Sequence, residues 1–539
     1  MSAEVARKQH VPDILDCLAQ LSNDEVPTPP KLARAMLDLL PADVWSNPHL
    51  KWLDPCCKSG AILREVAARL IVGLEAWEPD FHKRREHIFR NMLYGTSVTE
   101  LTGQVARRSV YCSHDAAGKR SVVRFEHATG NIPFVPAAHD FGADGSEHKC
   151  KVCGAPADLE RGNTRENYAY AFIHGAYPTK ELSDMKFDVI VGNPPYQVDS
   201  DGNTRTKPVY QLFVERAIKA SPRYVLMITP SRWFTGGLGL DEYRDRMIAD
   251  RRMRAIVDNP KVFDCFPGVE IMGGVSYFLW DRTHDGDCEF TTRVGGRSVS
   301  TASRDLREGE GVLVRDNRAA TVIAKVLAKM LPTAEAEFGP QVPFGLRTNY
   351  RFAEPKRFRG AVPVVYGTSI GYVRSDQIER NHQWIDRWKV LLSKAYNGGQ
   401  QVDDDGVVRQ TVLGEPIALA PGSACTQTYF MAGMFNAREE TENYAYYLAT
   451  KFVRFLVLQR KTTQDVTPDR FRFVPMLDMK RRWTDAQLYK KFGLTADESD
   501  HIERSIKPRS VNLSLDSPIP ASHLPGGSKH RAGTTGADE

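Results

Sequence analysis

The chain has 539 residues, of which 26% are charged and 9% aromatic, with 72 Lys+Arg against 67 Asp+Glu. This length exceeds what one hydrophobic core usually supports, so we expect several domains, and the composition excludes a wholly disordered chain. No run approaches the roughly 18 apolar residues of a membrane span, and the start lacks an apolar signal core, so we predict a cytoplasmic protein without a membrane partner.

The small positive net charge is concentrated in one region. Residues 331–510 carry 26 Lys+Arg and 21 Asp+Glu, whereas the rest of the chain is balanced. This excess indicates a phosphate-contacting surface in the C-terminal half, and a solvated surface with ordinary scatter in charge is the alternative.

The first 300 residues are predicted to form an α/β domain, because strands alternate with helices as in a largely parallel sheet covered on both faces. The predicted strands are residues 50–54, 93–98, 187–192, 223–229 and 255–258, followed by a hairpin-like pair at 270–280 and 288–294. Apolar residues at three- and four-residue spacing predict helices at residues 61–77, 99–110, 208–220 and 240–252.

A loop of small residues follows the first predicted strand and precedes the first of these helices. It reads Asp54-Pro55-Cys56-Cys57-Lys58-Ser59-Gly60. Small side chains let the backbone approach a ligand, and the helix N-terminus offers free N–H groups to a carboxylate or phosphate. The GxxxxGK[ST] spacing of a phosphate-binding P-loop is absent, and a simple tight turn is the alternative.

Residues 111–165 are rich in Gly, His and Cys and predict a subdomain inserted into the α/β domain. Five candidate metal ligands lie in it: Cys112, His114, His148, Cys150 and Cys153. The Cys150–Cys153 spacing followed by Gly154 suits two thiolates on one ion, and Cys112 with either histidine would complete a tetrahedral Zn²⁺ site. We predict a structural zinc, with two free cysteines in a surface loop as the alternative.

The pattern most specific for chemistry is an apolar strand that runs into Asn193-Pro194-Pro195-Tyr196. Two prolines force an extended backbone and remove two N–H donors, which leaves carbonyls and the Asn193 amide as acceptors beside an aromatic ring. Such a site suits a flat ligand with an amine, such as adenine. Asn193 and the Pro194 carbonyl would accept the two N6 hydrogens while Tyr196 stacks on the base. The alternative is a Pro-Pro turn that only ends a strand.

Residues 301–507 lack the alternating rhythm and predict a second, mixed α+β domain. Its predicted strands are residues 362–366 and 388–392, and its predicted helices are residues 441–458 and 485–492. Residues 508–539 are rich in Ser, Pro and Gly with few large apolar residues, so we predict a disordered tail.

Together, the two loops resemble the gamma-class N6-adenine DNA methyltransferases, in particular the large type II restriction-modification methylases. The loop that binds S-adenosylmethionine in this family reads approximately Asp-Pro-Ala-Cys-Gly-Ser-Gly, and the chain matches it at Asp54, Pro55, Cys57, Ser59 and Gly60. Lys58 stands where a glycine is usual and could pair with the carboxylate of the cofactor. The segment Asn193–Tyr196 matches the catalytic motif of the family. The resemblance covers about residues 25–285.

The resemblance implies a Rossmann-like methyltransferase domain that binds S-adenosylmethionine. It also implies a site-specific enzyme that methylates N6 of an adenine flipped out of double-stranded DNA, in a bacterial or phage-encoded restriction-modification or defence system. The implied catalytic residues are Asn193, Pro194, Pro195 and Tyr196.

Two further cofactor contacts follow from the resemblance. Thr28 matches the Thr-Pro segment that precedes the cofactor loop in the family, although it could instead be the N-cap of a helix at residues 31–40. The family has an acid at the end of the second strand, where this chain has Ser97. The nearest carboxylate, Glu100, is the candidate ribose ligand, and an acid in the first turn of a helix is its alternative.

The resemblance makes residues 301–507 the target-recognition domain. Aromatic and basic residues are mixed at Thr426–Phe430, Asn443–Tyr447, Arg454, Arg460, Lys461 and Arg470–Arg472. Contacts to phosphates and base edges need such a mixture. The helical spacing of Phe452, Phe455 and Leu456 favours a core position for those three residues.

Other activities remain open. The same Asn-Pro-Pro-Tyr segment could serve methylation of cytosine N4, of an RNA adenine or of a glutamine amide in a protein. The chain could also be the methylase or recognition subunit of a larger restriction assembly with a separate nuclease or helicase partner. Cytosine-C5 chemistry is excluded, because it needs a nucleophilic Pro-Cys where Asn193-Pro194 stands.

Overall fold

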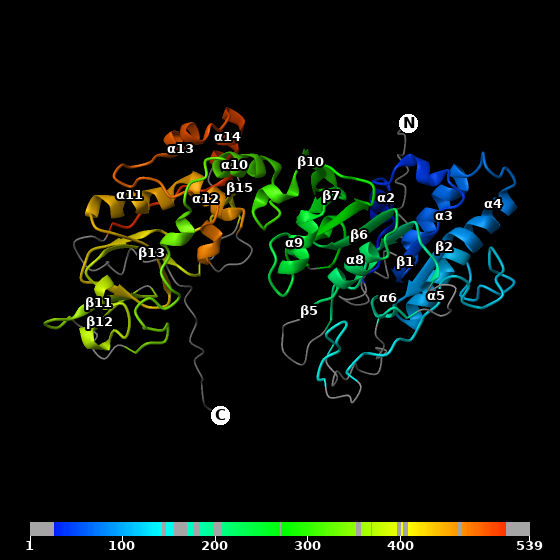
Figure 1. Ribbon diagram of the computed structural model, residues 1–539, viewed down its shortest axis with the longest axis horizontal. Helices are drawn as coiled ribbons and strands as arrows, with labels where there is room; N and C mark the ends of the chain where they lie inside the picture. Colours follow the sequence, from blue (N-terminus) through cyan, green and yellow to red (C-terminus); the bar gives the residue numbers. More distant parts are fainter. Residues whose placement is uncertain are drawn as a thin grey trace, which may run out of the picture. The chain divides into compact units, whose positions relative to one another are not determined.

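The structure is a computed structural model that describes residues 26–142, 147–155, 170–176, 184–198, 207–269, 271–351, 357–367, 369–395, 400–402, 408–460 and 466–513. The chain divides into two compact units, residues 1–317 and 318–539 (Figure 1). The boundary lies beyond the predicted residue 300, because the last strand of the first unit ends at Arg304.

The first unit is built on a twisted sheet of eight strands in the order β10-β9-β7-β8-β6-β3-β1-β2. The strands are β1 (Trp52–Cys57), β2 (Leu93–Ser97), β3 (Val189–Gly192), β6 (Tyr224–Pro230), β7 (Met253–Asn259), β8 (Val275–Asp281), β9 (Cys288–Val294) and β10 (Arg297–Arg304). Strands β1, β2, β3 and β6 are parallel, as the alternating sequence pattern predicts. This confirms the α/β fold class.

The predicted hairpin of residues 270–280 with 288–294 is wrong. Strand β8 lies between β6 and β7 and is antiparallel to both. Strand β9 lies on the other side of β7, between β7 and β10, so β8 and β9 do not pair with each other. A period-two pattern marks a strand but does not say which neighbour it pairs with. The hairpin of this region is instead β9–β10, which turns at Gly295 and Gly296, both with positive φ.

Helices cover both faces of this sheet. They are α2 (Pro30–Leu37), α3 (Ala61–Gly73), α4 (Phe81–His87), α5 (Glu100–Tyr111), α6 (Ala171–His174), α8 (Tyr210–Lys219) and α9 (Asp241–Ala249). The chain moves outward from β1 to β2 through α3, and in the opposite direction from β3 to β6 through α8. Right-handed crossovers therefore place α3 and α8 on opposite faces. The buried core between the layers includes Trp52, Val191 and Trp280.

The inserted segment begins beside the edge strand β2. The Gly95 amide donates to the Asn131 carbonyl at 2.9 Å, and the Ser97 amide donates to the Pro133 carbonyl at 3.1 Å. A parallel bridge joins Ser97 to Phe134, so this stretch extends the sheet irregularly. The described part of residues 112–155 otherwise consists of turns, bends and short bridges.

The second unit contains small sheets and helices, which is the mixed character that the sequence predicts. Its main elements are α10 (Asn317–Leu327), β11 (Val362–Tyr366), β12 (Ser369–Val373), β13 (Trp388–Ser393), β16 (Ile417–Leu419), β17 (Ala424–Cys425), β18 (Tyr429–Phe435), α11 (Arg438–Ala449), α12 (Lys451–Leu458), α13 (Asp485–Phe492) and α14 (Ala496–Ser505). The predicted single helix at 441–458 is two helices, because Thr450 has extended backbone and caps α12 by accepting from the Val453 amide.

The first part of the predicted disordered tail is ordered at Asn512. The Asn512 amide donates to the Pro416 carbonyl at 3.0 Å, and the Ala418 amide donates to the Asn512 carbonyl at 2.9 Å, so Asn512 is held against β16. Residues 514–539 lie outside the described residues.

Among the described helices, none combines the length and apolar character needed to cross a bilayer.

Candidate active site

The order of the strands creates a crevice between β1 and β3. From β1 the chain continues to one side of the sheet, and from β3 it continues to the other. At such a switch point the two loops diverge, and ligands of open α/β sheets bind there at the carboxyl ends of the strands. The loop after β1 contains Lys58–Gly60, and the segment after β3 is Asn193–Tyr196. The fold therefore brings together the two segments that the sequence singled out.

A small pocket lies at this switch point. Its lining residues are Thr28, Asp54, Cys56, Lys58, Ser59, Gly60, Ala61, Ile62 and Asn193. Five of the eight predicted cofactor residues and the predicted catalytic asparagine thus share one pocket. Pro55 and Cys57 are part of β1 beside it, and Cys57 is fully buried.

Gly60 allows the loop to turn closely into α3. It is the N-cap of that helix with φ +73°, and no side chain caps the helix. A Cβ at this position would lie 2.9 Å from the Ala106 carbonyl oxygen on α5. A larger residue at position 60 would therefore clash with α5. The first residues of α3 line the pocket, and the N–H groups at a helix N-terminus suit an anionic group of a ligand.

Asp54 is a buried carboxyl group with a raised pKa. Its side chain is 4% exposed, and its Oδ1 accepts from the Cys56 amide at 3.1 Å. Burial raises the pKa of Asp54 from 3.8 to about 6, and the Cys56 amide and the Lys58 charge offset only part of this effect. The buried charge costs folding energy at neutral pH, which is typical of a residue retained for binding.

The side-chain amide of Asn193 is held in one orientation and leaves its oxygen available as an acceptor. Its side-chain nitrogen donates to the Val26 carbonyl oxygen at 3.0 Å, which turns the amide oxygen away from that carbonyl. The residue is 3% exposed, and its Oδ1 has no hydrogen-bond partner among the described residues. A buried acceptor without a donor is costly, so this oxygen is suited to receive an N–H group from a ligand.

Cys56 joins the two segments, a role that the sequence analysis missed. The backbone amide of Asn193 donates to the Cys56 sulfur, and a Cβ on Gly192 would lie only 2.9 Å from that sulfur. Burial, followed by the charge of Asp54, raises the pKa of the Cys56 thiol well above its ordinary value, so the group is a neutral packing residue. The absence of a side chain at Gly192 was the available signal for this close approach.

Tyr196 and Lys58 form the other side of the site. The Tyr196 ring is 7% exposed, and the Lys58 ammonium lies 5.8 Å from the ring centroid. Lys58 also donates to the Val26 carbonyl at 3.3 Å, so the same carbonyl receives Lys58 and Asn193. The Tyr196 carbonyl accepts from the Val209 amide at 3.1 Å, which anchors the segment to the start of α8.

The structure distinguishes the two further cofactor candidates. Thr28 is 5% exposed and lines the pocket. The N-cap of α2 is Pro29 and makes no side-chain cap bond, so the alternative reading of Thr28 as an N-cap is wrong. Glu100 is the first residue of α5, with its carboxylate 4.0 Å from the Arg107 guanidinium, and it does not line the pocket.

Comparisons with known proteins agree with this geometry. A family model described as Eco57I restriction-modification methylase matches residues 91–266. The chain is 34% identical over 339 residues to an "Uncharacterized adenine-specific methylase" of Mycoplasma pneumoniae (strain ATCC 29342 / M129 / Subtype 1), an alignment that covers 58% of this chain and 80% of that protein. The chain belongs to the adenine-specific methylase family.

Matches among solved structures include the type I restriction-modification methyltransferase subunit from Streptococcus thermophilus, which is 13% identical and has a TM-score of 0.31 over 53% of each chain. Another is the DrdV–DNA complex, which is 11% identical with a TM-score of 0.40, over 88% of this chain and 56% of that one. The methylase spans about half the length of these two proteins.

The five metal ligands predicted for this methylase do not come together. Cys112 is exposed and ends α5 with φ +60°, and both His114 and His148 are exposed. Cys150 and Cys153 are buried, and they lie beside two histidines that the prediction did not include, His139 and His174. The spacing of these histidines from the Cys150–Cys153 pair is too wide to be recognised as a local motif.

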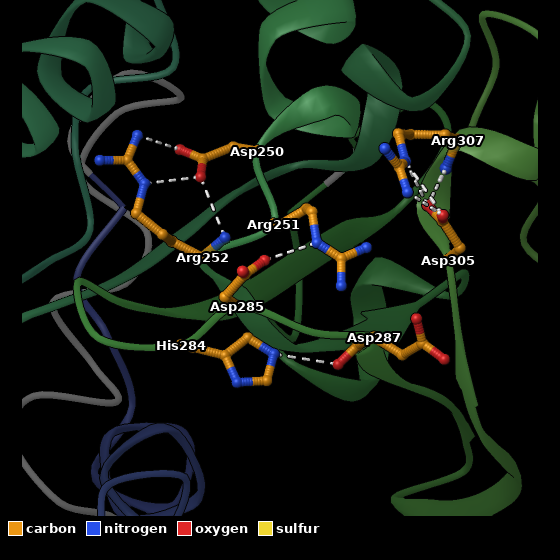
Figure 2. Close-up of polar contacts among 8 residues, drawn as sticks. All are labelled: Asp250, Arg251, Arg252, His284, Asp285, Asp287, Asp305 and Arg307. Carbon is orange, nitrogen blue, oxygen red and sulfur yellow. Dashed lines mark hydrogen bonds and ion pairs between the residues drawn. The ribbon is translucent and has the colours of Figure 1, made fainter.

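A larger pocket, of about 1050 Å³, lies at the amino-terminal ends of the parallel strands, around the segment that precedes β7. Its charged groups are largely paired with each other (Figure 2). Arg252 Nε donates to Asp250 at 2.7 Å, and Arg251 Nε donates to Asp285 at 2.6 Å. The His284 ring lies 3.1 Å from the Asp287 carbonyl oxygen. In the smaller pocket, by contrast, the Asn193 oxygen has no hydrogen-bond partner among the described residues.

In the second unit, most residues predicted to recognise DNA are internal. Tyr444 and Tyr447 are fully buried, and Arg454 is 1% exposed, with its Nε donating to the Ala449 carbonyl at 3.0 Å. Arg460 is 6% exposed and donates to the Asp469 carbonyl at 3.0 Å. These arginines stabilise helix ends and turns. The core reading of Phe452, Phe455 and Leu456 is confirmed, and Lys461 lies outside the described residues.

Exposed arginines lie elsewhere in this unit, around the segment before β11. They are Arg347, Arg351, Arg357 and Arg359. Within the part of the chain that the structure describes, none of the four forms an ion pair with an acidic side chain. Their close spacing in the sequence was a signal that the sequence analysis did not use.

Proposed function

We propose that this methylase transfers a methyl group from S-adenosylmethionine to N6 of an adenine flipped out of double-stranded DNA. The observation that carries the proposal is the Asn193 side chain. Its oxygen is buried and has no partner among the described residues, while its nitrogen is held by Val26. An acceptor fixed in this way is complementary to an amine donor.

The amine would be activated by two acceptors. Asn193 Oδ1 accepts one N6 hydrogen, and the Pro194 carbonyl, whose direction is restricted by Pro195, accepts the other. Both interactions increase electron density on the nitrogen as it attacks, and neither needs a covalent enzyme intermediate. The Tyr196 ring packs against the face of the base, as aromatic side chains do with extrahelical bases.

The residues of the switch-point pocket fit S-adenosylmethionine, which supplies the methyl group when it is bound. The free N–H groups of α3 and the ammonium of Lys58 favour the carboxylate of an amino-acid moiety. Asp54, with its raised pKa, would accept hydrogen bonds from the cofactor, and Thr28, which precedes α2, would line the cofactor pocket. Glu100 is the remaining candidate for the ribose hydroxyls.

DNA would be held in part by the exposed arginines of the second unit, since phosphate contacts need basic side chains that are not already paired. We further propose that the methylation is site-specific and protects DNA in a restriction-modification or defence system. A nuclease or helicase subunit is then the expected protein partner.

The first experiment incubates the protein with methyl-labelled S-adenosylmethionine and duplex DNA, then digests the DNA to nucleosides. We expect labelled N6-methyladenine, and Asn193→Ala should reduce the rate by about 10²–10³-fold while cofactor affinity changes little. Arg251→Ala, at the opposite edge of the sheet, is the control for general effects on folding. Label on cytosine, on RNA alone or on a protein glutamine would contradict the proposal.

The second experiment tests the arginines. The double variant Arg347→Ala/Arg357→Ala should weaken DNA binding and reduce the dependence of log K on log salt by about one to two units, because each phosphate contact contributes roughly 0.9. Arg318→Ala is a matched control, since that arginine already pairs with Asp497 at 3.3 Å. An unchanged salt dependence would remove these arginines from the DNA surface.

A further inference from the structure

Four side chains from the stretch between α5 and β3 converge on one point. They are His139, Cys150, Cys153 and His174, and one ligand atom from each lies within 4.8 Å of all the others. Cys153 Sγ is 3.4 Å from His139 Nδ1, and Cys150 Sγ is 3.9 Å from His174 Nε2. A tetrahedral zinc ion with bonds of about 2.0–2.3 Å holds its ligand atoms roughly 3.3–3.8 Å apart. The four atoms therefore need only small shifts to coordinate one ion.

The two cysteines lie in a turn that presents both sulfurs on the same side. The Gly154 amide donates to the Cys150 carbonyl at 2.8 Å, and Gly154 has φ +71°, which closes the turn after Cys153. The backbone amides of Cys153 and Val152 donate to the Cys150 sulfur. Amides directed at a sulfur stabilise the thiolate, the form in which cysteine binds metal.

The two histidines come from separate parts of this stretch between α5 and β3. His139 follows the stretch that extends the sheet beside β2, and His174 is the last residue of α6. Both rings are half-buried, and they meet edge to face with centroids 5.7 Å apart.

We propose that His139, Cys150, Cys153 and His174 bind a structural Zn²⁺. Two thiolates and two imidazoles are the ligand set of closed structural zinc sites, and a closed site has no open position for substrate. Cys150, Cys153 and Phe172 belong to the main hydrophobic core, and Val135, Ala137 and Ala171 form a separate minor cluster. A metal would add folding energy to a stretch with little regular secondary structure.

The ion would brace the catalytic side of the fold without taking part in chemistry. Helix α6 carries Phe172, whose ring stacks on Phe213 of α8 with centroids 6.1 Å apart. Helix α8 begins where the Tyr196 carbonyl is anchored by Val209. Coordination through His174 would therefore link the edge of the sheet to the helix that supports the Asn193–Tyr196 segment.

The experiment measures metal by mass spectrometry in the purified full-length protein. We expect one zinc per chain, with loss to below a tenth of that in Cys150→Ser/Cys153→Ser and substantial loss in His139→Ala and His174→Ala. The controls Cys112→Ser, His114→Ala and His148→Ala alter the residues predicted from sequence alone, and each should retain one zinc. Loss of zinc in these controls together with retention in His139→Ala would overturn the proposed ligand set.

A second measurement does not depend on folding of the variants. Titration of the wild-type protein with a mercurial thiol reagent should release one zinc, detected with a chromogenic chelator. Replacement by Co²⁺ should give the visible absorption of a tetrahedral ion with two thiolate ligands. Wild-type protein that contains no zinc and takes up neither Zn²⁺ nor Co²⁺ would overturn the proposal. Neither readout depends on methyl transfer, so these measurements test the metal site independently of the proposed activity.

Discussion

At the amino-terminal edge of the central sheet lies a pocket of about 1050 Å³, and its charged side chains are largely paired with one another. The pocket at the carboxyl-terminal edge is much smaller, but it contains the buried Asn193 oxygen and the buried Asp54 carboxyl group. Charges that satisfy each other leave little free energy for a ligand, whereas a buried group without a partner gains from one. The proposed function therefore rests on a buried acceptor that lacks a partner among the described residues, and not on the size of a pocket.

Among substitutions that test the contrast between these two pockets, we expect the largest effect where the loop after β1 approaches the segment after β3. Gly192→Ala places a Cβ about 2.9 Å from the Cys56 sulfur and should push Asn193 out of position. A displacement near 1 Å costs about 10²-fold in rate, and overpacking costs about 1–3 kcal/mol of stability. Methyl transfer and urea unfolding measure these effects.

The matched control is the double variant Gly192→Ala/Cys56→Ala, which removes the sulfur that the new methyl group meets. It should recover most of the lost rate and stability, because the two substitutions couple through one contact. A single variant as active as the wild type would show that the two loops are not held at this distance.

The next effect concerns Asp54. Because its folded pKa of about 6 exceeds the unfolded value of 3.8, the folded state binds more protons between these values, and stability falls as pH rises through this range. Asp54→Asn keeps the acceptor for the Cys56 amide and removes the buried charge, so it should raise the free energy of unfolding by roughly 3 kcal/mol near pH 8.

The gain should shrink to almost nothing near pH 3, about one unit below the unfolded pKa of 3.8, where Asp54 of the wild type is mostly protonated in both states. Urea melts at several pH values would follow this change. The same variant should bind S-adenosylmethionine more weakly. A constant difference between the two proteins across this pH range would show that burial does not shift the pKa of Asp54.

A smaller effect is expected at Lys58. Lys58→Met keeps much of the length of the side chain but removes the charge, and it should weaken binding of S-adenosylmethionine by about tenfold, as is typical of one charged contact. Lys58→Arg should lose less. Decarboxylated S-adenosylmethionine should bind the wild type and Lys58→Met equally in calorimetry, and unequal binding would assign Lys58 a role away from the carboxylate.

The reactive edge was largely predictable from sequence because its residues belong to short segments next to strands. Asp54–Gly60 and Asn193–Tyr196 each follow a strand, and a parallel sheet necessarily brings the carboxyl ends of its strands to one edge. The local order of residues therefore determined most of the pocket.

The remaining features depend on contacts between distant residues. His139 and His174 join Cys150 and Cys153 only through the path of the insertion, which no spacing rule describes. Arginine is a residue type that often contacts DNA, yet Arg454 is buried and donates to backbone carbonyls. Residue type states what a side chain can do, but burial and partners decide whether it is free to do so.

The smallest effect is predicted at the amino-terminal edge, at Arg251. Arg251→Ala removes an ion pair with Asp285 in which the two side chains are 40% and 82% exposed. Solvent screens such a pair, so stability should change by less than about 0.5 kcal/mol and the rate of methyl transfer by less than about twofold. Asp285→Ala should behave in the same way, and the double variant should show little coupling.

A loss of activity above tenfold in either single variant, with unchanged stability, would mean that the larger pocket binds a ligand needed for the reaction. The contrast between the two edges of the sheet would then fail, because charges that are paired in the free protein would have to exchange partners during the reaction.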